Sequence, residues 1–322
     1  MSRLELVPFS DEHVEAAAAL LAARHARHRV AEPLLSPRYE QPAAAQAELE
    51  LLWRTAGASG AAGYRGGQLV GYLVGAPREH PMWGDNVFVE PAGHAVEEAE
   101  DLRDLYAVAA ARWVEEGRPR HSVIAPAHDS AVLDAWWRLS FGQQQAHGIQ
   151  EVRPQTERSI PEGFEIRPPR EDEVEQLIDV DLALPQHQAA SPVFGGGEPP
   201  TREESRDEWL ETLAGNDETI LIGARDRRPV ACWAFVAAER TSSHVGLARP
   251  DDACHLGFAA TLPDARGSGI GVALTEAGLA WAADAGYRTM ITDWRVTNLL
   301  ASRFWPRRGF RTSFLRLYRS IP

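Results

Sequence analysis

The chain has 322 residues, of which 44% are hydrophobic, and carries a formal net charge of −13. This length suits two domains of ordinary size, each with a packed core. The acidic balance argues against nucleic acid as a partner, because binding phosphates requires a basic surface. No apolar run approaches the length of a membrane span, and the N-terminus lacks a signal-like segment. We therefore expect a cytoplasmic protein that does not act on membranes.

The two cysteines, Cys232 and Cys254, fall in strand-like apolar runs. We expect them to fill the core rather than form a disulfide, and no CxxC or His/Cys cluster indicates a metal site. Charge is unevenly distributed, because residues 266–322 hold nine arginines and only three carboxylates. An anionic ligand is expected near this basic segment, and a cationic ligand would be drawn to the acidic remainder of the chain.

In chain order, the first half contains an apolar strand at 68–74 and a strand–helix unit at 121–142 that ends in Phe-Gly. Between them, residues 89–98 read Val-Glu-Pro-Ala-Gly-His-Ala-Val-Glu-Glu. Glu97, Glu98 and Glu100 lie close together along this stretch, and like charges repel an anion. We therefore expect the first half to bind no phosphate-bearing ligand and to serve as a scaffold or as one wall of a substrate cleft.

The second half repeats the plan of the first, since 289–310 parallels 121–142 and 229–234 parallels 68–74. A polar, proline-bearing linker at 153–163 separates the two copies, which predicts domains at 1–155 and 160–322. A glycine-rich loop at 191–200 is a candidate lid. The elements predicted for this half are strands at 164–167, 219–223, 230–238, 255–261, 289–294 and 311–319, and helices at 171–184, 202–213, 272–285 and from 298 onward.

The segment Leu262–Gly271 reads Leu-Pro-Asp-Ala-Arg-Gly-Ser-Gly-Ile-Gly between a predicted strand and a predicted helix. Such a turn directs unpaired backbone N–H groups to one point at the positive end of the helix dipole, where a pyrophosphate binds. A side chain at any of the three glycines would block close approach or forbid the backbone angles. No lysine follows, so this is no Walker loop, and its glycine spacing differs from that of the dinucleotide fingerprint. The alternative is a turn without a ligand.

The run Arg266–Gly271 resembles the acyl-CoA signature of the GCN5-related N-acetyltransferases (GNAT superfamily). A second block of the same family is matched by Asn298, Ala301, Phe304, Trp305, Gly309 and Phe310. The resemblance implies an α/β (α+β) fold with two tandem acetyltransferase-fold domains, each a mixed, mostly antiparallel sheet flanked by helices. In plan, the chain is similar to two-domain actinobacterial acetyltransferases such as mycothiol synthase.

The resemblance also implies that acetyl-CoA is a cosubstrate and that the acetyl group passes to the amine of a small molecule. We expect direct transfer in a ternary complex, because no cysteine is placed as an acyl carrier, and we expect no metal. The alternative is a non-catalytic protein that senses acyl-CoA or a small ligand. The oligomeric state is left open. Residues that would bind the cosubstrate are Ala260, Thr261, Arg266, Gly267, Ser268, Gly269, Ile270, Gly271, Asn298, Ala301 and Phe304.

His255 is the candidate general base, since the resemblance places a base at this distance before the arginine and the ordinary histidine pKa suits the task. A two-residue period would put His255, Gly257, Ala259 and Thr261 on one face of the strand. The alternative is a half-buried histidine satisfied by a neighbour. Weaker candidates for the base are His187, Asp251 and Asp252.

Trp305 occupies the position where most family members have a tyrosine that protonates the departing thiolate. Indole is a hydrogen-bond donor but no useful acid, so the thiolate leaves without help or Ser302 or Tyr318 substitutes. Pro306 is predicted to break the helix at Trp305. Asn298 is expected to cap that helix. Trp294 is flanked by Asp293 and Arg295, and these two charged residues are expected to form a surface ion pair.

Overall fold

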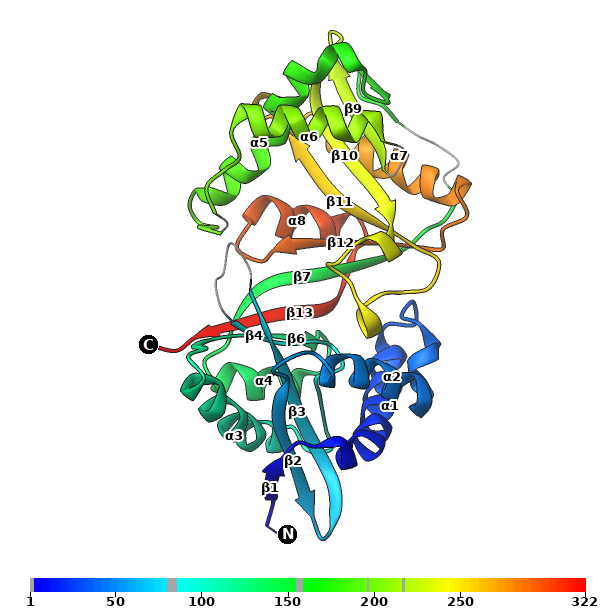
Figure 1. Ribbon diagram of the computed structural model, residues 1–322. Coiled ribbons are helices and arrows are strands. Elements are labelled where there is room, and N and C mark those ends of the chain that lie inside the picture. The colour runs from blue at the N-terminus through cyan, green and yellow to red at the C-terminus, as the bar shows by residue number, and fades with distance from the viewer. Residues whose placement is uncertain (1–2, 80–85, 155–158, 196, 216–217) are drawn as a thin grey trace. The chain divides into compact units, whose positions relative to one another are not determined.

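The computed structural model describes residues 3–79, 86–154, 159–195, 197–215 and 218–322 (Figure 1). Linker residues 155–158 and Gly196 of the predicted lid lie outside these ranges. The chain divides into two compact units. Unit 1 comprises residues 1–147, 244–250 and 312–322, and unit 2 comprises residues 148–243 and 251–311. The limits 1–155 and 160–322 remain a prediction about the repeated segments of the sequence.

Unit 1 is built on a mixed sheet in which β4 and β6 pair in parallel and the other described pairs are antiparallel. The C-terminal strand pairs with β6 and so completes this unit. In spatial order the strands are β1 (Glu5–Pro8), β2 (Ser59–Arg65), β3 (Gln68–Arg78), β4 (Asn86–Val89), β6 (Arg120–Pro126) and β13 (Arg311–Ser320), with β5 (His94–Val96) beside β3.

The α-helices of the described part of unit 1 are α1 (Val14–Ala31), α2 (Pro42–Trp53), α3 (Asp101–Glu115) and α4 (Ser130–Arg138). Within 89–98, β4 ends at Val89, a turn follows in which the Gly93 N–H donates to the Glu90 carbonyl, and β5 then pairs with β3. Glu98 forms an ion pair with Arg65, and Glu100 bonds to Arg103 and Arg138. The acidic residues at this place are therefore held by arginines of the same unit.

Unit 2 has a sheet in the order β12-β11-β10-β9-β8, in which β11 and β12 pair in parallel and the other pairs are antiparallel. Strand β7 (Gly142–Glu151) begins in unit 1 and ends in unit 2. The remaining strands of unit 2 are β8 (Phe164–Arg167), β9 (Thr219–Arg225), β10 (Arg228–Ala237), β11 (Ala253–Thr261) and β12 (Thr289–Arg295), and its helices are α5 (Val174–Ala189), α6 (Arg202–Ala214), α7 (Ile270–Asp284) and α8 (Leu299–Arg307) (Figure 1).

Opposite faces of this sheet carry different helices. One face packs Cys232 and Ile222 into a core with Leu177 of α5 and Trp209 of α6. On the other face α7 lies very close to the strands, because it presents a glycine to the sheet. A Cβ added at Gly278 would be 2.2 Å from the ring of Phe235 on β10.

A β-bulge at Gly257 changes the face to which β11 directs its side chains. Phe258 pairs with Ala234 and Leu256 with Phe235, so Gly257 is left without a partner on β10. Beyond this extra residue the alternation is reversed, and His255 shares its face with Phe258 rather than with Ala259. The prediction that His255, Ala259 and Thr261 lie on one face is therefore wrong.

Strands β11 and β12 diverge after a short paired segment. Their parallel pairing covers Ala253–His255 against Thr289–Ile291, and the described residues show no further pair beyond it. The hydroxyl of Thr292 still donates to the Leu256 carbonyl at 2.9 Å. Along the later residues of β11, the backbone groups on the β12 side therefore have no neighbouring strand to pair with.

The mixed, mostly antiparallel sheets flanked by helices confirm the predicted fold class. Both cysteines are free and buried, as expected. Pro306 does not end α8 at Trp305, so that prediction is wrong: the helix runs to Arg307. Because proline lies in the last turn, it removes only one intrahelical bond, and Gly309 closes the end with a φ of +92°. None of the described helices has the length and apolar character needed to cross a membrane.

Candidate functional site

A cavity of about 420 Å³ opens in unit 2 where β11 and β12 diverge. We call it the glycine-loop cavity. Its wall combines the last residues of β11, the start of α7, one face of α8 and three side chains of α5. The lining residues are Ala183, Leu184, His187, Trp233, Ala259, Ala260, Thr261, Ala265, Arg266, Gly267, Gly269, Ile270, Gly271, Val272, Asn298, Leu300, Ala301, Phe304 and Trp305.

The glycine-rich turn adopts the backbone that its sequence requires. Gly267 and Gly269 have φ of +78° and +91°, values that favour glycine. Gly271 lies in the first turn of α7, where the backbone N–H groups have no partner inside the helix. Its missing side chain leaves space, since an added Cβ would lie 3.4 Å from the ring of Trp233. Ser268 is not in the cavity wall, because its hydroxyl donates to the Ala265 carbonyl at 2.7 Å.

Alternation along β11 decides which backbone amides face the cavity. The N–H of Leu262 donates to Val230 of β10 at 2.9 Å, so the N–H of Ala260, two residues earlier, also points to β10. The N–H groups of Ala259 and Thr261 consequently point the other way, toward the edge that β12 leaves open. The Thr261 carbonyl on that side accepts a hydrogen bond from Arg266 Nε at 3.2 Å.

Helix α8 contributes a polar cap to the cavity. The side-chain oxygen of Asn298 accepts hydrogen bonds from the backbone N–H groups of Leu300 and Ala301 at 3.1 and 3.2 Å, which confirms the expected cap. His187 of α5 lies 3.1 Å from the same oxygen through its Nε2. His187, a weaker candidate for the base, is therefore part of this wall.

Two tryptophans form the apolar side of the glycine-loop cavity. Trp305 is buried and packs edge-on against Phe304, Phe310 and Trp233, the last at a ring distance of 6.4 Å. The indole nitrogen of Trp233 is buried, and the structure gives it no hydrogen-bond partner among the described residues. A buried donor without an acceptor is costly for stability.

A second cavity in unit 2, of about 390 Å³, lies on the face of the sheet that carries α5 and α6. We call it the His255 cavity. It reaches β11 at His255, Gly257 and Phe258, directly before the residues that line the glycine-loop cavity. The other lining residues are Asp181, Glu208, Trp209, Thr212, Glu218, Ile220, Cys232, Ala234, Phe235, Val236, Arg240, Thr241 and Ser242.

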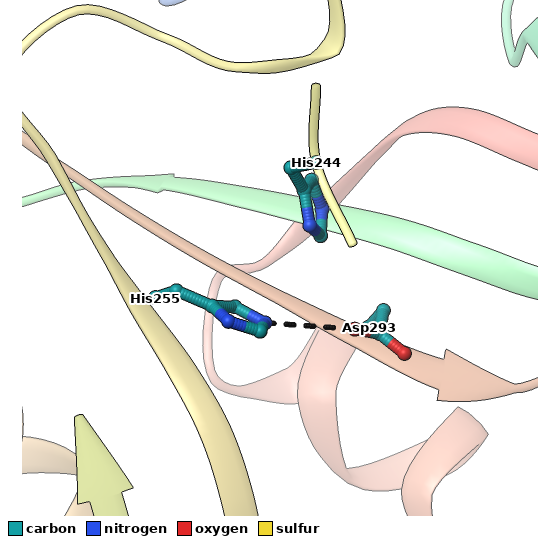
Figure 2. A group of neighbouring side chains, drawn as sticks. All are labelled: His244, His255 and Asp293. Atoms are coloured by element: carbon teal, nitrogen blue, oxygen red, sulfur yellow. Dashed lines mark ion pairs between the residues drawn. The ribbon is translucent and has the colours of Figure 1, made fainter. Parts of the chain in front are cut away.

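His255 is held by two polar neighbours although only 5% of it is exposed. Its Nε2 lies 3.5 Å from Asp293 of β12, the ion pair dashed in Figure 2, and 3.4 Å from the hydroxyl of Ser243. The carboxylate expected only at the surface is thus directed at the histidine. The third side chain in Figure 2, His244, belongs to unit 1, where its ring lies 4.4 Å from that of His147.

The two predicted catalytic residues lie in different walls: His255 in the His255 cavity and Trp305 in the glycine-loop cavity. All predicted cosubstrate-binding residues except Ser268 line the glycine-loop cavity. Asp251 and Asp252, the other candidates for the base, are in neither wall, and Tyr318 belongs to unit 1.

Several residues of these walls had no motif to mark them. Trp233 lies in an ordinary apolar strand, and Asp181 and Glu208 lie on helices that carry several other charged residues. A helical spacing could have placed Asp181 near Leu177 and Leu184, but only packing against the sheet shows that it borders a cavity.

Comparisons with known proteins agree with this geometry. The model of the acetyltransferase (GNAT) family matches residues 184–310. A GCN5-related N-acetyltransferase from Sphaerobacter thermophilus is 14% identical, with a TM-score of 0.59 over 99% of this chain and 96% of that one. A tandem GNAT protein from the clavulanic acid biosynthesis pathway is 14% identical, with a TM-score of 0.50 over 99% and 98% of the two chains. A search of curated proteins finds no match.

The fold is therefore that of tandem GNAT proteins. Residues 184–310, which contain β11, the glycine-rich turn and α8, are the part of the chain that matches the GNAT acetyltransferase family. Family and fold support transfer of an acyl group from an acyl-CoA to an amine. The likeness to mycothiol synthase remains a prediction.

Proposed function

We propose that unit 2 transfers an acetyl group from acetyl-CoA to the amine of a small molecule, by direct transfer in a ternary complex. The observation that carries the proposal is the glycine-loop cavity, whose wall joins a positive-φ glycine turn at a helix N-terminus to the open edge of β11. Such a helix start binds a pyrophosphate, and an open strand edge pairs with an extended amide chain.

The residues present fit acetyl-CoA in this cavity. Backbone N–H groups of Gly267, Gly269 and Gly271 would bind the pyrophosphate, and Arg266 would add positive charge beside it. The outward N–H groups of Ala259 and Thr261 would bind pantetheine and the acetyl oxygen. In this proposal Thr261 has the role that the sequence left open between it and Ala260, because the Ala260 N–H points to β10. Phe304, Ala301 and Asn298 would line the far side of the pantetheine.

In the proposed reaction, the amine nitrogen attacks the thioester carbonyl carbon, forming a C–N bond while the C–S bond breaks. His255 accepts the proton that the amine loses, with Asp293 orienting its ring. The thiolate leaves as an anion. Trp305 supports the packing of the wall of the glycine-loop cavity.

Direct transfer is favoured over an acyl-enzyme because neither cysteine suits a nucleophile. Burial raises the pKa of Cys254 to about 12 and also raises the pKa of the fully buried Cys232. Both thiols therefore stay protonated at neutral pH, and the thiolate is the reactive form. The rival hypothesis, a sensor that binds acyl-CoA without turnover, predicts no CoA release with any amine.

A charge placed in the first turn of α7 tests the cosubstrate site. Gly271→Glu should abolish acetyl-CoA binding, measured by calorimetry, because its carboxylate would lie where the pyrophosphate binds. Gly271→Gln has the same size without the charge and should retain part of the affinity. Both variants place the same bulk near the rings of Trp233 and Phe304, so a difference in affinity between them reports the charge. Equal binding by both variants and the native protein would overturn the proposal.

A further inference from the structure

From the charges and shape of the His255 cavity, we infer that the acceptor is a small amine that carries a second positive charge, a diamine or polyamine-like molecule with an apolar spacer. The inference rests on the proposed acetyl transfer and names its substrate class. The cavity volume of about 390 Å³ suits a small molecule.

The position of the cavity relates it to the transfer step. Its wall on β11 ends at Phe258, and the wall of the glycine-loop cavity begins at Ala259, the next residue of the same strand. The bulge at Gly257 turns His255 to the α5 and α6 face, into this second cavity. An amine bound beside His255 is therefore adjacent along β11 to the proposed site of the acetyl group.

The wall away from β11 is acidic. It contains Asp181 of α5, Glu208 of α6 and Glu218 just before β9, whereas Arg240 is the one arginine or lysine among the described lining residues. Asp181 is fixed in place, because its carboxylate accepts a hydrogen bond from Ser205, which is fully buried. A cation is attracted to such a wall, and an anionic acceptor is repelled.

The cavity also has an apolar part. Trp209 of α6 and Ile220 of β9 line it and are buried in the core on this face of the sheet, whereas the Phe235 ring lies on the other face, against α7. A methylene chain packs favourably on such a surface, and a cation near Trp209 gains from the negative face of its ring. The wall thus matches an amine and an ammonium separated by a short hydrocarbon chain.

The acid–base state of the wall supports the same ligand. Burial raises the pKa of Asp181. Burial and the nearby charges of Asp181 and Glu218 raise the pKa of Glu208. In addition to burial, the shift at Glu208 reflects neighbouring carboxylates without enough compensating positive charge, whereas the shift at Asp181 reflects burial. An ammonium group bound among these carboxylates would provide that charge.

Three acceptors that share one five-carbon chain test the inference: cadaverine, aminopentanol and aminovalerate. With the full chain saturated with acetyl-CoA, the expected KM for cadaverine, measured from CoA release, is at least about tenfold below that for aminopentanol, with aminovalerate poorest. Asp181→Asn should remove most of this preference. The control variant Asp207→Asn, on α6, removes the same amount of negative charge as Asp181→Asn. Because Asp207 lies outside the cavity wall, this variant should retain the preference.

Calorimetry of cadaverine with the CoA-bound protein separates the two proposals. If no amine is acetylated but cadaverine binds and Asp181→Asn weakens that binding about tenfold, acetyl transfer is overturned and the cation site stands. If amines are acetylated with equal KM whatever their charge, or if Asp181→Asn and Asp207→Asn behave alike, the acceptor class proposed here is wrong while the transfer proposal survives.

Discussion

His255 combines near-complete burial with a place in a cavity wall. Its ring contacts Asp293 and Ser243. A histidine with a purely structural role could make the same two contacts. What separates the two roles is the side of the strand: the bulge at Gly257 directs the ring into the His255 cavity instead of toward α7. The sequence contains the glycine, but a one-residue bulge in a strand leaves the hydrophobic pattern almost unchanged.

A substitution at His255 tests its role as base. His255→Gln should lower kcat for amine acetylation by about 10²–10⁴-fold at neutral pH, the usual contribution of a general base. Its affinity for acetyl-CoA should not change, because His255 does not line the glycine-loop cavity. Steady-state kinetics and calorimetry on the same preparation give both values. His187→Gln, in the other wall, is the comparison and should alter acetyl-CoA affinity more than kcat. An unchanged kcat in His255→Gln would leave the histidine a packing role only.

At the scale of elements, the contact of α7 with β10 holds the glycine-rich turn against the open edge of β11. Gly278 lets the helix approach, because a Cβ there would lie 2.2 Å from Phe235. Gly223 of β9 likewise lets the start of α7 approach the sheet. A Cβ at Gly223 would lie 2.5 Å from Ile270, the first residue of α7. These two glycines lie in the middle of a helix and a strand because a larger side chain would not fit there. Secondary-structure propensity alone would not predict glycine at these positions.

The packing of α7 predicts an unusual response to a small substitution. Gly278→Ala, which normally stabilises a helix, should instead lower the free energy of unfolding by about 1–3 kcal/mol, because overpacking displaces Phe235. Urea unfolding followed by tryptophan fluorescence measures the loss. Phe235→Leu should also destabilise the native protein, yet it should make the added methyl less harmful in the double variant. Additive losses in the three variants would contradict the steric explanation.

At the scale of the whole molecule, the histidines of unit 1 connect folding to pH. Burial lowers the pKa of His25 and His121 to about 4, of His94 to about 3 and of His28 to about 2. The folded state therefore keeps them neutral, while the unfolded chain takes up protons below the ordinary histidine pKa of about 6.5. Their contribution to stability is present above that pH and is lost as the pH falls.

We expect the unfolding free energy of the chain to decrease as pH falls from about 6.5 to about 4. Each histidine that stays neutral in the folded state and is protonated in the unfolded state contributes roughly 1.4 kcal/mol per pH unit. Urea titrations followed by circular dichroism at several pH values measure this slope. His25→Gln, which removes one such group, should reduce the slope by about one proton. A stability that stays constant between pH 7 and pH 5 would show that these histidines charge freely in the folded protein.

The sequence by itself determined much of the glycine-loop cavity. Arg266–Gly271 predicted a phosphate-binding turn, and the block from Asn298 to Phe310 predicted the helix opposite it; both lie where one cavity forms. Their positions could be predicted because positive φ angles and a helix N-terminus are local requirements of neighbouring residues. Ser268 is the exception, since only its hydrogen bond to Ala265 shows that it turns away.

Only the tertiary structure decided what surrounds His255. The bulge in β11, the acidic wall from Asp181 to Glu218 and the approach of Asp293 bring together residues that are up to about a hundred positions apart in the chain. The same is true of Trp305, because the sequence does not show that three aromatic rings enclose its side chain. Local patterns fix backbone angles, whereas the faces of strands and the partners of side chains depend on register and packing between distant segments.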